Sequence, residues 1–533
     1  MKESNIRIMI LKIVLSLFII FLFTRLFYIQ IIKGEEYSKK AVEQKLRSFA
    51  IGEKRGDIYD RNMIPITDRE SKSYIYAIPE IIFDKSYAAQ LIGNYTDIPY
   101  QKIYKDLNSS KKYLKYVIKK QDKNHLPGGV FILTMPERYT SKSLARHIVG
   151  YVGEKNMGLE EYFNSVLSNK QQENIAVFTN GNNDYMQGLG IRIVGNNQNP
   201  YSVKTTLDYH IQKAVENILD ENHINGAAVV LDIKSGDILA MASRPNFDQN
   251  NIADYINSSN EEFVNKATSQ YPPGSIFKII TASAAIENNK VKADDLFDCS
   301  GSYSINGVVF HDYKGESHGL VDIKKGFAVS CNTTFIRIGE LTGGENILDM
   351  AKKFGLTTYD NNLPIQQQLG MLPKIEDTYG AGIGNLSIGQ GDVMLSPLQA
   401  ADIVATIAND GIRNVPNLIK GIVDERGNQI QNLYNKNSYR VISQNTSNII
   451  KEMMREVVTE GTGKRAETKY KSAGKTGSAE VSKQQNIYHA WFVGFVPYQN
   501  PKYAISVFVK NGDTGGTIAA PIFKKIAEEI MKY

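Results

Sequence analysis

Three short motifs carry the side chains with the clearest chemical potential in this sequence. They are Ser275–Lys278 (SIFK), Ser330–Asn332 (SCN) and Lys475–Gly477 (KTG), in that order along the chain. Together they supply a hydroxyl nucleophile, an amine that can act as its base, a second hydroxyl with an amide, and a further cation. These groups are the equipment for acyl transfer through a serine ester. The sequence therefore predicts a serine-dependent acyl-transfer site.

The first motif is informative only in its local sequence context, because the pattern S-x-x-K also occurs elsewhere, for example at Ser109 and Lys112. Residues 271–274 read YPPG, and two prolines and a glycine cannot continue a helix, whereas the apolar run after Ser275 can. We therefore expect Ser275 at a helix start, with Lys278 on the same face and close enough to accept its proton. An isolated match of this kind would be an ordinary N-cap serine with an exposed lysine.

The other two motifs lie beside apolar segments. Ser330 follows the run Phe327–Val329, so its hydroxyl and the Asn332 amide could relay a proton and hold a substrate amide, or could simply cap a helix. The KTG motif leads through Ser478 into a predicted strand, where a glycine permits close backbone approach and an extended peptide could pair. Lys475 and Thr476 could then bind a carboxylate; the alternative is an ordinary turn.

The N-terminus predicts a membrane anchor. Residues 13–24 carry no charge, and the apolar stretch runs over about 8–32, near the roughly 20 residues that span a bilayer. No small-residue cleavage site ends it, so we expect an uncleaved anchor, with a buried soluble helix as the alternative. Basic residues in the tail 1–7 favour a cytoplasmic N-terminus and place the remaining chain outside the membrane.

Composition and patterning divide the rest of the 533 residues. With 42% hydrophobic and 22% charged residues the chain is globular. The net charge is +6, and no basic cluster alternates with aromatics, so nucleic-acid binding is not expected. Residues 33–204 read as an extended, β-rich region. Residues 205–533 hold predicted hairpins at 226–242 and 490–509 with helices between and after them, which indicates an α+β domain with an antiparallel sheet.

With these motifs in place, the sequence resembles the penicilloyl serine transferases, and more narrowly a class B penicillin-binding protein. The supporting stretches, besides the three motifs, are 55–62 (RGDIYDRN), 271–275 (YPPGS), 388–391 (IGQG) with 396–399 (SPLQ), and 461–463 (GTG). The resemblance covers nearly the whole chain. It implies a dimerisation-like pedestal over 33–204 and a transpeptidase domain over 205–533, with the antiparallel sheet flanked by helices.

The resemblance also implies roles for the motif residues. Ser275 would attack a stem peptide at its penultimate D-Ala, Lys278 would take the proton, and Ser330 with Lys475 would pass a proton to the leaving D-Ala. Asn332 would position the donor amide, and Thr476, Gly477 and Ser478 would bind the donor, with the N–H groups of Ser275 and Ser478 as oxyanion hole. A second peptide's amine would complete the cross-link, and β-lactams would stall the enzyme.

Both cysteines lie near the second motif and suggest a structural metal site. Between Cys299 and Cys331 stand Asp312 and His318, and two thiolates, a carboxylate and an imidazole satisfy tetrahedral zinc. His311 is a reserve ligand. A zinc ion would brace the loop carrying Ser330 and Asn332, since the reaction itself needs no cofactor. Free thiols and a disulfide are the alternatives.

The function predicted from these observations is a membrane-bound peptidoglycan D,D-transpeptidase. Its partners would be stem peptides, β-lactams, the cytoplasmic membrane and a membrane glycosyltransferase. The rivals are a D,D-carboxypeptidase or β-lactamase of the same fold, in which water resolves the ester, and a non-catalytic β-lactam sensor or scaffold.

Overall fold

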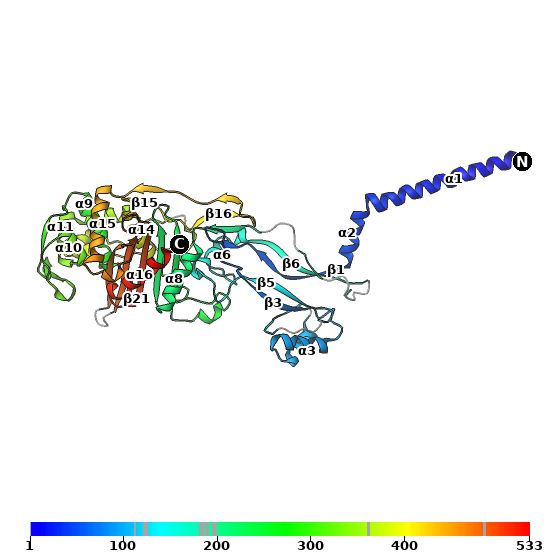
Figure 1. Cartoon of the computed structure of the whole chain (residues 1–533), viewed down its shortest axis with the longest axis horizontal. Helices are drawn as coiled ribbons and strands as arrows, with labels where there is room; N and C mark the ends of the chain where they lie inside the picture. Colours follow the sequence, from blue (N-terminus) through cyan, green and yellow to red (C-terminus); the bar gives the residue numbers. More distant parts are fainter. Residues whose placement is uncertain are drawn as a thin grey trace. The chain divides into compact units, whose positions relative to one another are not determined.

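The structure of the chain, a computed structural model, describes residues 2–110, 113–120, 126–180, 186, 191–194, 200–359, 363–482 and 487–533. Contacts divide it into two units that alternate along the sequence (Figure 1). The first unit comprises Met1–Lys54, Ser71–Pro136 and Lys170–Gln198, and the second comprises Arg55–Glu70, Glu137–Asn169 and Asn199–Tyr533. These contact-based units are made of other segments than the predicted domains, whose limits 33–204 and 205–533 remain a prediction.

The first unit begins with the apolar helix. Helix α1 (Lys2–Phe27) continues into a short π-helix (Tyr28–Ile32) and is followed by α2 (Gly34–Lys45). Within the described ranges, one helical stretch, Ser4–Ile32, is long and apolar enough to cross a membrane, with a mean hydropathy of 2.6. Its apolar side chains are exposed, as expected for a segment whose partner is lipid rather than protein.

Two small sheets and two helices make up the rest of the first unit. The sheets have the strand orders β1-β6-β7 and β4-β3-β5. The helices α3 and α4 pack with buried residues of β3, such as Ile75 and Ala77, and this region carried no recognisable chemistry in the sequence. The β-rich character predicted here is confirmed. The elements are β1 (Leu46–Arg55), β3 (Glu70–Ala77), α3 (Lys85–Thr96), α4 (Tyr100–Ser109), β4 (Leu114–Val117), β5 (Val130–Glu137), β6 (Ser168–Phe178) and β7 (Ile191–Val194).

A five-stranded antiparallel sheet organises the second unit. Its strand order is β10-β9-β21-β20-β19, so the two predicted hairpins, β9–β10 and β20–β21, lie side by side through β9 and β21. The predicted antiparallel sheet is therefore confirmed. The strands are β9 (Gly226–Asp232), β10 (Ile238–Arg244), β19 (Ala473–Ser482), β20 (Ile487–Val496) and β21 (Tyr503–Gly512).

Both faces of this sheet are covered by helices. Along β9, Val229 belongs to the apolar cluster that also contains residues of α9 (Lys278–Glu287) and α14 (Pro397–Ala408). The next residue, Val230, belongs to the cluster that contains α8 (Tyr209–Glu221) and α16 (Ala520–Ile530). This alternation follows from the two-residue period of a strand. It explains why β9 is apolar throughout rather than alternately polar.

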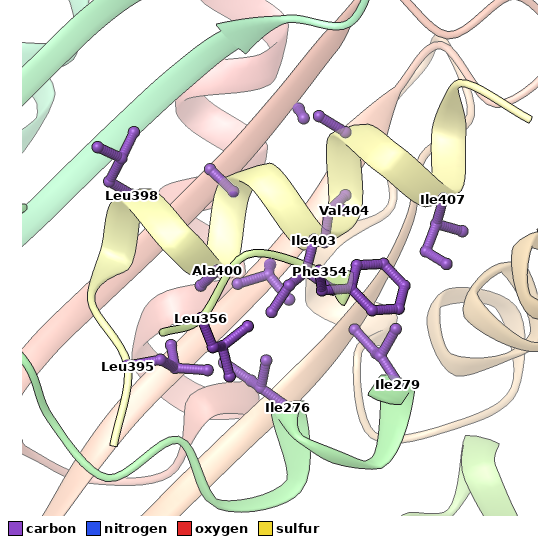
Figure 2. Packing of buried hydrophobic residues seen from close by; sticks show 14 of the residues in the cluster. Ile276, Ile279, Phe354, Leu356, Leu395, Leu398, Ala400, Ile403, Val404 and Ile407 are labelled. Carbon is purple, nitrogen blue, oxygen red and sulfur yellow. The ribbon is translucent and has the colours of Figure 1, made fainter. Parts of the chain in front are cut away.

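Helix α14 contributes Leu398, Ala400, Ile403, Val404 and Ile407 to the larger cluster (Figure 2). A capping box starts it: Ser396 Oγ accepts from Gln399 N, and the Gln399 side chain accepts from Ser396 N. Figure 2 shows Ile276 and Ile279, which precede and follow Lys278 in the sequence, on one side of this helix together with Phe354 and Leu356. The chain segment that carries the first motif is thereby fixed on a packed core.

The remaining elements of the second unit complete the scaffold. A further sheet has the order β17-β16-β8-β2, and three two-stranded ribbons pair β11 with β14, β12 with β13 and β15 with β18. The strands are β2 (Ile58–Tyr59), β8 (Ser202–Thr205), β11 (Leu296–Cys299), β12 (Ser302–Ile305), β13 (Val308–His311), β14 (Gly319–Asp322), β15 (Ile412–Asn414), β16 (Ile419–Val423), β17 (Gln429–Asn432) and β18 (Ser438–Arg440). The helices are α5 (Arg146–Val149), α6 (Gly158–Tyr162), α7 (Asn164–Leu167), α10 (Ile323–Ala328), α11 (Asn332–Thr342), α12 (Gly344–Lys353), α13 (Gly382–Ser387) and α15 (Gln444–Thr459).

Candidate active site

Ser275 lies in a 3₁₀ turn, Gly274–Ile276, directly ahead of α9. The turn is pressed against strand β19. Gly274 has φ +54°, and a Cβ there would lie 3.0 Å from the carbonyl oxygen of Ser478. The indole N–H of Trp491 donates to the Pro272 carbonyl at 3.0 Å and secures the preceding segment. The predicted helix start is thus present, and a glycine is required for the close approach.

Lys278 is the first residue of α9 and is completely buried. Its Nζ donates to the Ser330 carbonyl at 2.6 Å and to Asn332 Oδ1 at 2.8 Å, and lies 3.5 Å from Ser330 Oγ. Burial lowers the pKa of this amine to about 8. Near neutral pH a useful fraction of Lys278 is therefore unprotonated, as a base for a serine must be.

Ser330 occupies the turn between α10 and α11 in a left-handed conformation, with φ +63°. A non-glycine residue in this region costs about 1–2 kcal/mol. The next residue, Cys331, caps α11, since its sulfur accepts from Thr334 N at 3.3 Å. The turn holds the Ser330 hydroxyl 2.9 Å from Lys475 Nζ, so the first and second motifs meet the third at this oxygen.

Lys475 is also fully buried, and its pKa is held well below the usual value by burial and by repulsion from Lys278. It lies on β19, which pairs with β20 alone among the strands that the structure describes. The outer edge of β19 therefore presents backbone donors and acceptors beside Ser275. An extended peptide can bind there by adding a strand.

Hydroxyl groups follow Lys475 along β19. Ser478 Oγ accepts a hydrogen bond from Gly515 N at 3.1 Å, and Thr476 Oγ1 lies 2.6 Å from the hydroxyl of Thr462. Between them, Gly477 has no room for a side chain, because a Cβ would lie 2.8 Å from the Pro273 carbonyl oxygen. Thr476 and Ser478 share one side of the strand, as alternate residues do.

The four residues predicted to bind zinc come together in space. One donor atom from each of Cys299, Asp312, His318 and Cys331 lies within 4.8 Å of the others. Cys299 Sγ lies 3.1 Å from His318 Nδ1 and 2.9 Å from Cys331 Sγ, and both thiols are free, so they are not joined as a disulfide. Two sulfurs, an imidazole and a carboxylate form a donor set that suits tetrahedral zinc.

This cluster is bonded to the start of α11. Asp312 Oδ1 accepts from the backbone N–H groups of Asn332 and Thr333, and Oδ2 accepts from Thr333 Oγ1 at 2.8 Å. The side chain of Asn332 also donates to the backbone carbonyl of His311 at 3.0 Å. Asn332, which holds Lys278, is therefore fixed from behind by the predicted metal-site residues. His311 contributes this carbonyl, and its ring is outside the cluster.

All eight residues predicted to serve catalysis or donor binding occupy the segments that meet at Ser330 and along β19. Sequence reasoning missed Thr462, although residues 461–463 were recognised as a supporting stretch. Its position beside Thr476 depends on how the loop after α15 packs, which the sequence does not reveal.

Comparisons with known proteins agree with this geometry. The family described as penicillin-binding protein transpeptidase domain matches residues 226–528, and the penicillin-binding protein dimerisation domain matches 50–175. Stage V sporulation protein D of Bacillus subtilis is 28% identical over 100% of this chain and 87% of its own length. Peptidoglycan D,D-transpeptidase PbpA of Mycolicibacterium smegmatis is 31% identical over 70% of this chain and 79% of its own.

A solved structure shows the same fold. Penicillin-binding protein A from M. tuberculosis, as a ceftriaxone acyl-enzyme complex, superposes with a TM-score of 0.62 at 28% identity, covering 72% of this chain and 90% of that one. The fold and site define a penicillin-binding serine acyltransferase. The chain belongs to the penicillin-binding protein transpeptidase family and has the class B arrangement, in which a dimerisation domain precedes the transpeptidase domain.

Proposed function

We propose that this chain is a peptidoglycan D,D-transpeptidase in which Ser275 forms the acyl-enzyme. The proposal rests on one observation above all. The buried amine of Lys278, the first residue of α9, is held by Asn332 and by the Ser330 backbone and has a pKa lowered by burial to about 8. A buried amine with a lowered pKa, three residues after a serine, supports a role as the base of that serine.

Acylation begins when Ser275 Oγ attacks the carbonyl of the penultimate D-Ala and its proton passes to Lys278. The peptide bond to the terminal D-Ala then breaks. The leaving amine takes a proton through Ser330 and Lys475, because the Ser330 hydroxyl oxygen lies 2.9 Å from Lys475 Nζ. The backbone N–H groups of Ser275 and Ser478 stabilise the oxyanion. The amine of a second stem peptide attacks the ester, forms the cross-link and releases Ser275.

Strand β19 and its neighbours bind the donor peptide. The donor extends along the open edge of β19, and Asn332 holds its amide. Gly477 lets the turn that carries Ser275 pack closely against this strand. Thr476 and Ser478 bind the terminal carboxylate through their hydroxyls. β-Lactams present a similar carboxylate and carbonyl, and their leaving group stays attached, so the acyl-enzyme accumulates.

Labelling with fluorescent penicillin tests this function. The detergent-solubilised chain should form a stable covalent adduct, and Ser275→Ala should form none. A chain that remains unlabelled, or labelling that survives Ser275→Ala, would overturn the assignment. Rapid loss of the label would favour the β-lactamase, and release of D-Ala without cross-linked product would favour the carboxypeptidase. Covalent labelling without turnover of either kind would favour the sensor or scaffold.

We further infer a single-pass anchor over residues 8–32, with tail 1–7 in the cytoplasm and the catalytic part outside the membrane. The apolar helix Ser4–Ile32 and the basic residues of the tail support this orientation. In this arrangement residues 33–204 form the pedestal and 205–533 the transpeptidase domain. A membrane glycosyltransferase that makes the glycan strands is the expected partner. Protease protection of the catalytic part in sealed inside-out vesicles tests the orientation.

A structural zinc ion at Cys299, Asp312, His318 and Cys331 remains part of the proposal. It would brace the start of α11, to which Asp312 is already bonded, and the transfer reaction would use no cofactor. Metal analysis should find one zinc per chain, and Cys299→Ser should lose it. Metal-free wild type would leave the two cysteines as free thiols.

A further inference from the structure

The loop Gly461–Gly463 is wedged between the second and third motifs. Thr462 N donates to the Ala328 carbonyl at 3.1 Å, just ahead of the Ser330 turn. A Cβ on Gly461 would lie 2.1 Å from that same oxygen, and a Cβ on Gly516 would lie 2.6 Å from the Thr462 carbonyl. These contacts fix the backbone of Thr462 closely, so its hydroxyl reaches the site from a defined position.

The hydroxyl of Thr462 forms a pair with that of Thr476, with their Oγ1 atoms 2.6 Å apart. Thr462 is exposed, whereas Thr476 is only 6% exposed. Within the described part of the chain, this is the one hydrogen bond that either hydroxyl makes. The pair carries two protons and uses one of them internally, so one O–H remains to donate to a ligand.

From this geometry we propose that Thr462 is a positioning residue for recognition of the donor's terminal carboxylate. The proposal rests on the transpeptidase function and deepens it. Thr462 donates to Thr476, and Thr476 then directs its own proton to the carboxylate. A hydroxyl that already accepts a hydrogen bond is a stronger donor, and donation to an anion is the stronger kind of bond.

Ser478 completes the same subsite. Its Oγ accepts from Gly515 N, which leaves the Ser478 proton free to point toward the anion. Thr476 and Ser478 lie on the same side of β19, and each has its proton directed by a neighbour: Thr462 in one case and the Gly515 backbone in the other. The carboxylate thus meets two oriented O–H donors, and only one of the two orienting groups is a side chain that mutation can remove.

The test uses two thioester acyl donors that differ only at the leaving end, which is a carboxylate in one and the corresponding amide in the other. The rate constant for acylation divided by the dissociation constant is measured for both with the full-length chain. Thr462→Val keeps the shape of the side chain and removes the hydroxyl. It should lower this ratio about tenfold for the carboxylate donor, which corresponds to one good hydrogen bond, and should not change the ratio for the amide donor.

Two further variants separate positioning from folding. Thr462→Ser restores a hydroxyl and should restore the preference for the carboxylate donor. Thr459→Val removes an exposed hydroxyl whose hydrogen bonds, among the residues that the structure describes, go to the Arg455 and Glu456 carbonyls in the last turn of α15. It should change the acylation rate for neither donor.

Three results would overturn the proposal. If Thr462→Val slows acylation equally for the two donors, Thr462 has a structural role. If acylation of neither donor changes, Thr462 has no role. If the wild type does not prefer the carboxylate donor, there is no carboxylate recognition for Thr462 to support. Failure of the transpeptidase function looks different, because the wild type would then form no Ser275-dependent acyl-enzyme with either donor.

Discussion

The Nζ of Lys475 lies 2.9 Å from the hydroxyl oxygen of Ser330, which joins the last motif of the sequence to the middle one. Lys278 Nζ lies 3.5 Å from the same oxygen. Two buried amines therefore lie beside one hydroxyl. Burial, together with repulsion from Lys278, keeps the pKa of Lys475 well below its usual value. The Ser330 hydroxyl is the common point through which a proton can pass between them.

Removal of this hydroxyl should stop proton transfer without unfolding the chain. Ser330→Ala and Ser330→Gly should each slow acylation of Ser275 by penicillin by a factor of about 100 or more, because acid–base catalysis is lost. The two variants should differ in stability, because Ser330 has φ +63° and glycine adopts this conformation without strain. Thermal unfolding should show the glycine variant to be more stable by about 1 kcal/mol. Rapid acylation in either variant would exclude Ser330 from the relay.

Acylation by penicillin should increase with pH and level off above about 8. Burial lowers the pKa of Lys278 to about 8, and only the neutral amine can accept the proton of Ser275. Below that pH the neutral fraction, and with it the second-order acylation rate, should fall about tenfold per pH unit. Stopped-flow labelling across this range gives the profile. A flat profile through neutral pH would show that Lys278 is not the base.

Gly274→Ala should damage the site more than the fold. Both Gly274 and Gly307 have positive φ, at +54° and +82°, so alanine costs backbone strain of about 1 kcal/mol at each position. A new Cβ at 274 lies 3.0 Å from the Ser478 carbonyl oxygen, whereas at 307 nothing lies within 4 Å. Gly274→Ala should therefore lose at least as much stability as Gly307→Ala, and only Gly274→Ala should slow penicillin labelling, by about tenfold or more. Equal labelling rates would show that the close approach to β19 does not matter.

The capping box of α14 should be measurable by itself. Ser396→Ala removes the acceptor for Gln399 N and should lower the free energy of unfolding by about 1 kcal/mol. Ser396→Asp supplies another good cap and should lose little. Chemical denaturation of the full-length chain in detergent measures both. Equal stability of the alanine and aspartate variants would mean that the packing of α14, rather than its cap, decides its stability.

Much of the fold and most of the site could be predicted because the signals are local. The YPPG segment before Ser275 predicts where a helix can begin, and the two hairpins follow from short apolar runs separated by turn residues. Lys278 could be assigned to the site because it lies three residues after Ser275. The four residues of the proposed zinc site were predicted from their ligand chemistry, and the structure brings their donor atoms together.

What the sequence could not reveal depends on contacts between distant residues. The hydroxyl pair of Thr462 and Thr476 arises from the packing of a loop against a strand edge. The role of Asp312 in holding the start of α11 competes with its value as a ligand, and no local pattern distinguishes the two. The left-handed conformation of Ser330 is imposed by the junction of two helices rather than by residue preference. The assembly of each unit from separate segments of the chain likewise depends on contacts between residues far apart in the sequence.

The pairing of β9 with β21 has a consequence for how the chain reaches its native state. Val229, early in the second unit, pairs with Ser506, near the C-terminus. Between them in sequence lie α9, α11 and α14, so the central strands meet only after almost the whole chain is available. Pairing of such sequence-distant strands is slow, and until β21 arrives one edge of the β9–β10 hairpin is open to other chains. We therefore expect chains that end before β21 to aggregate, and folding of the catalytic part to be completed only when the last strands have been made.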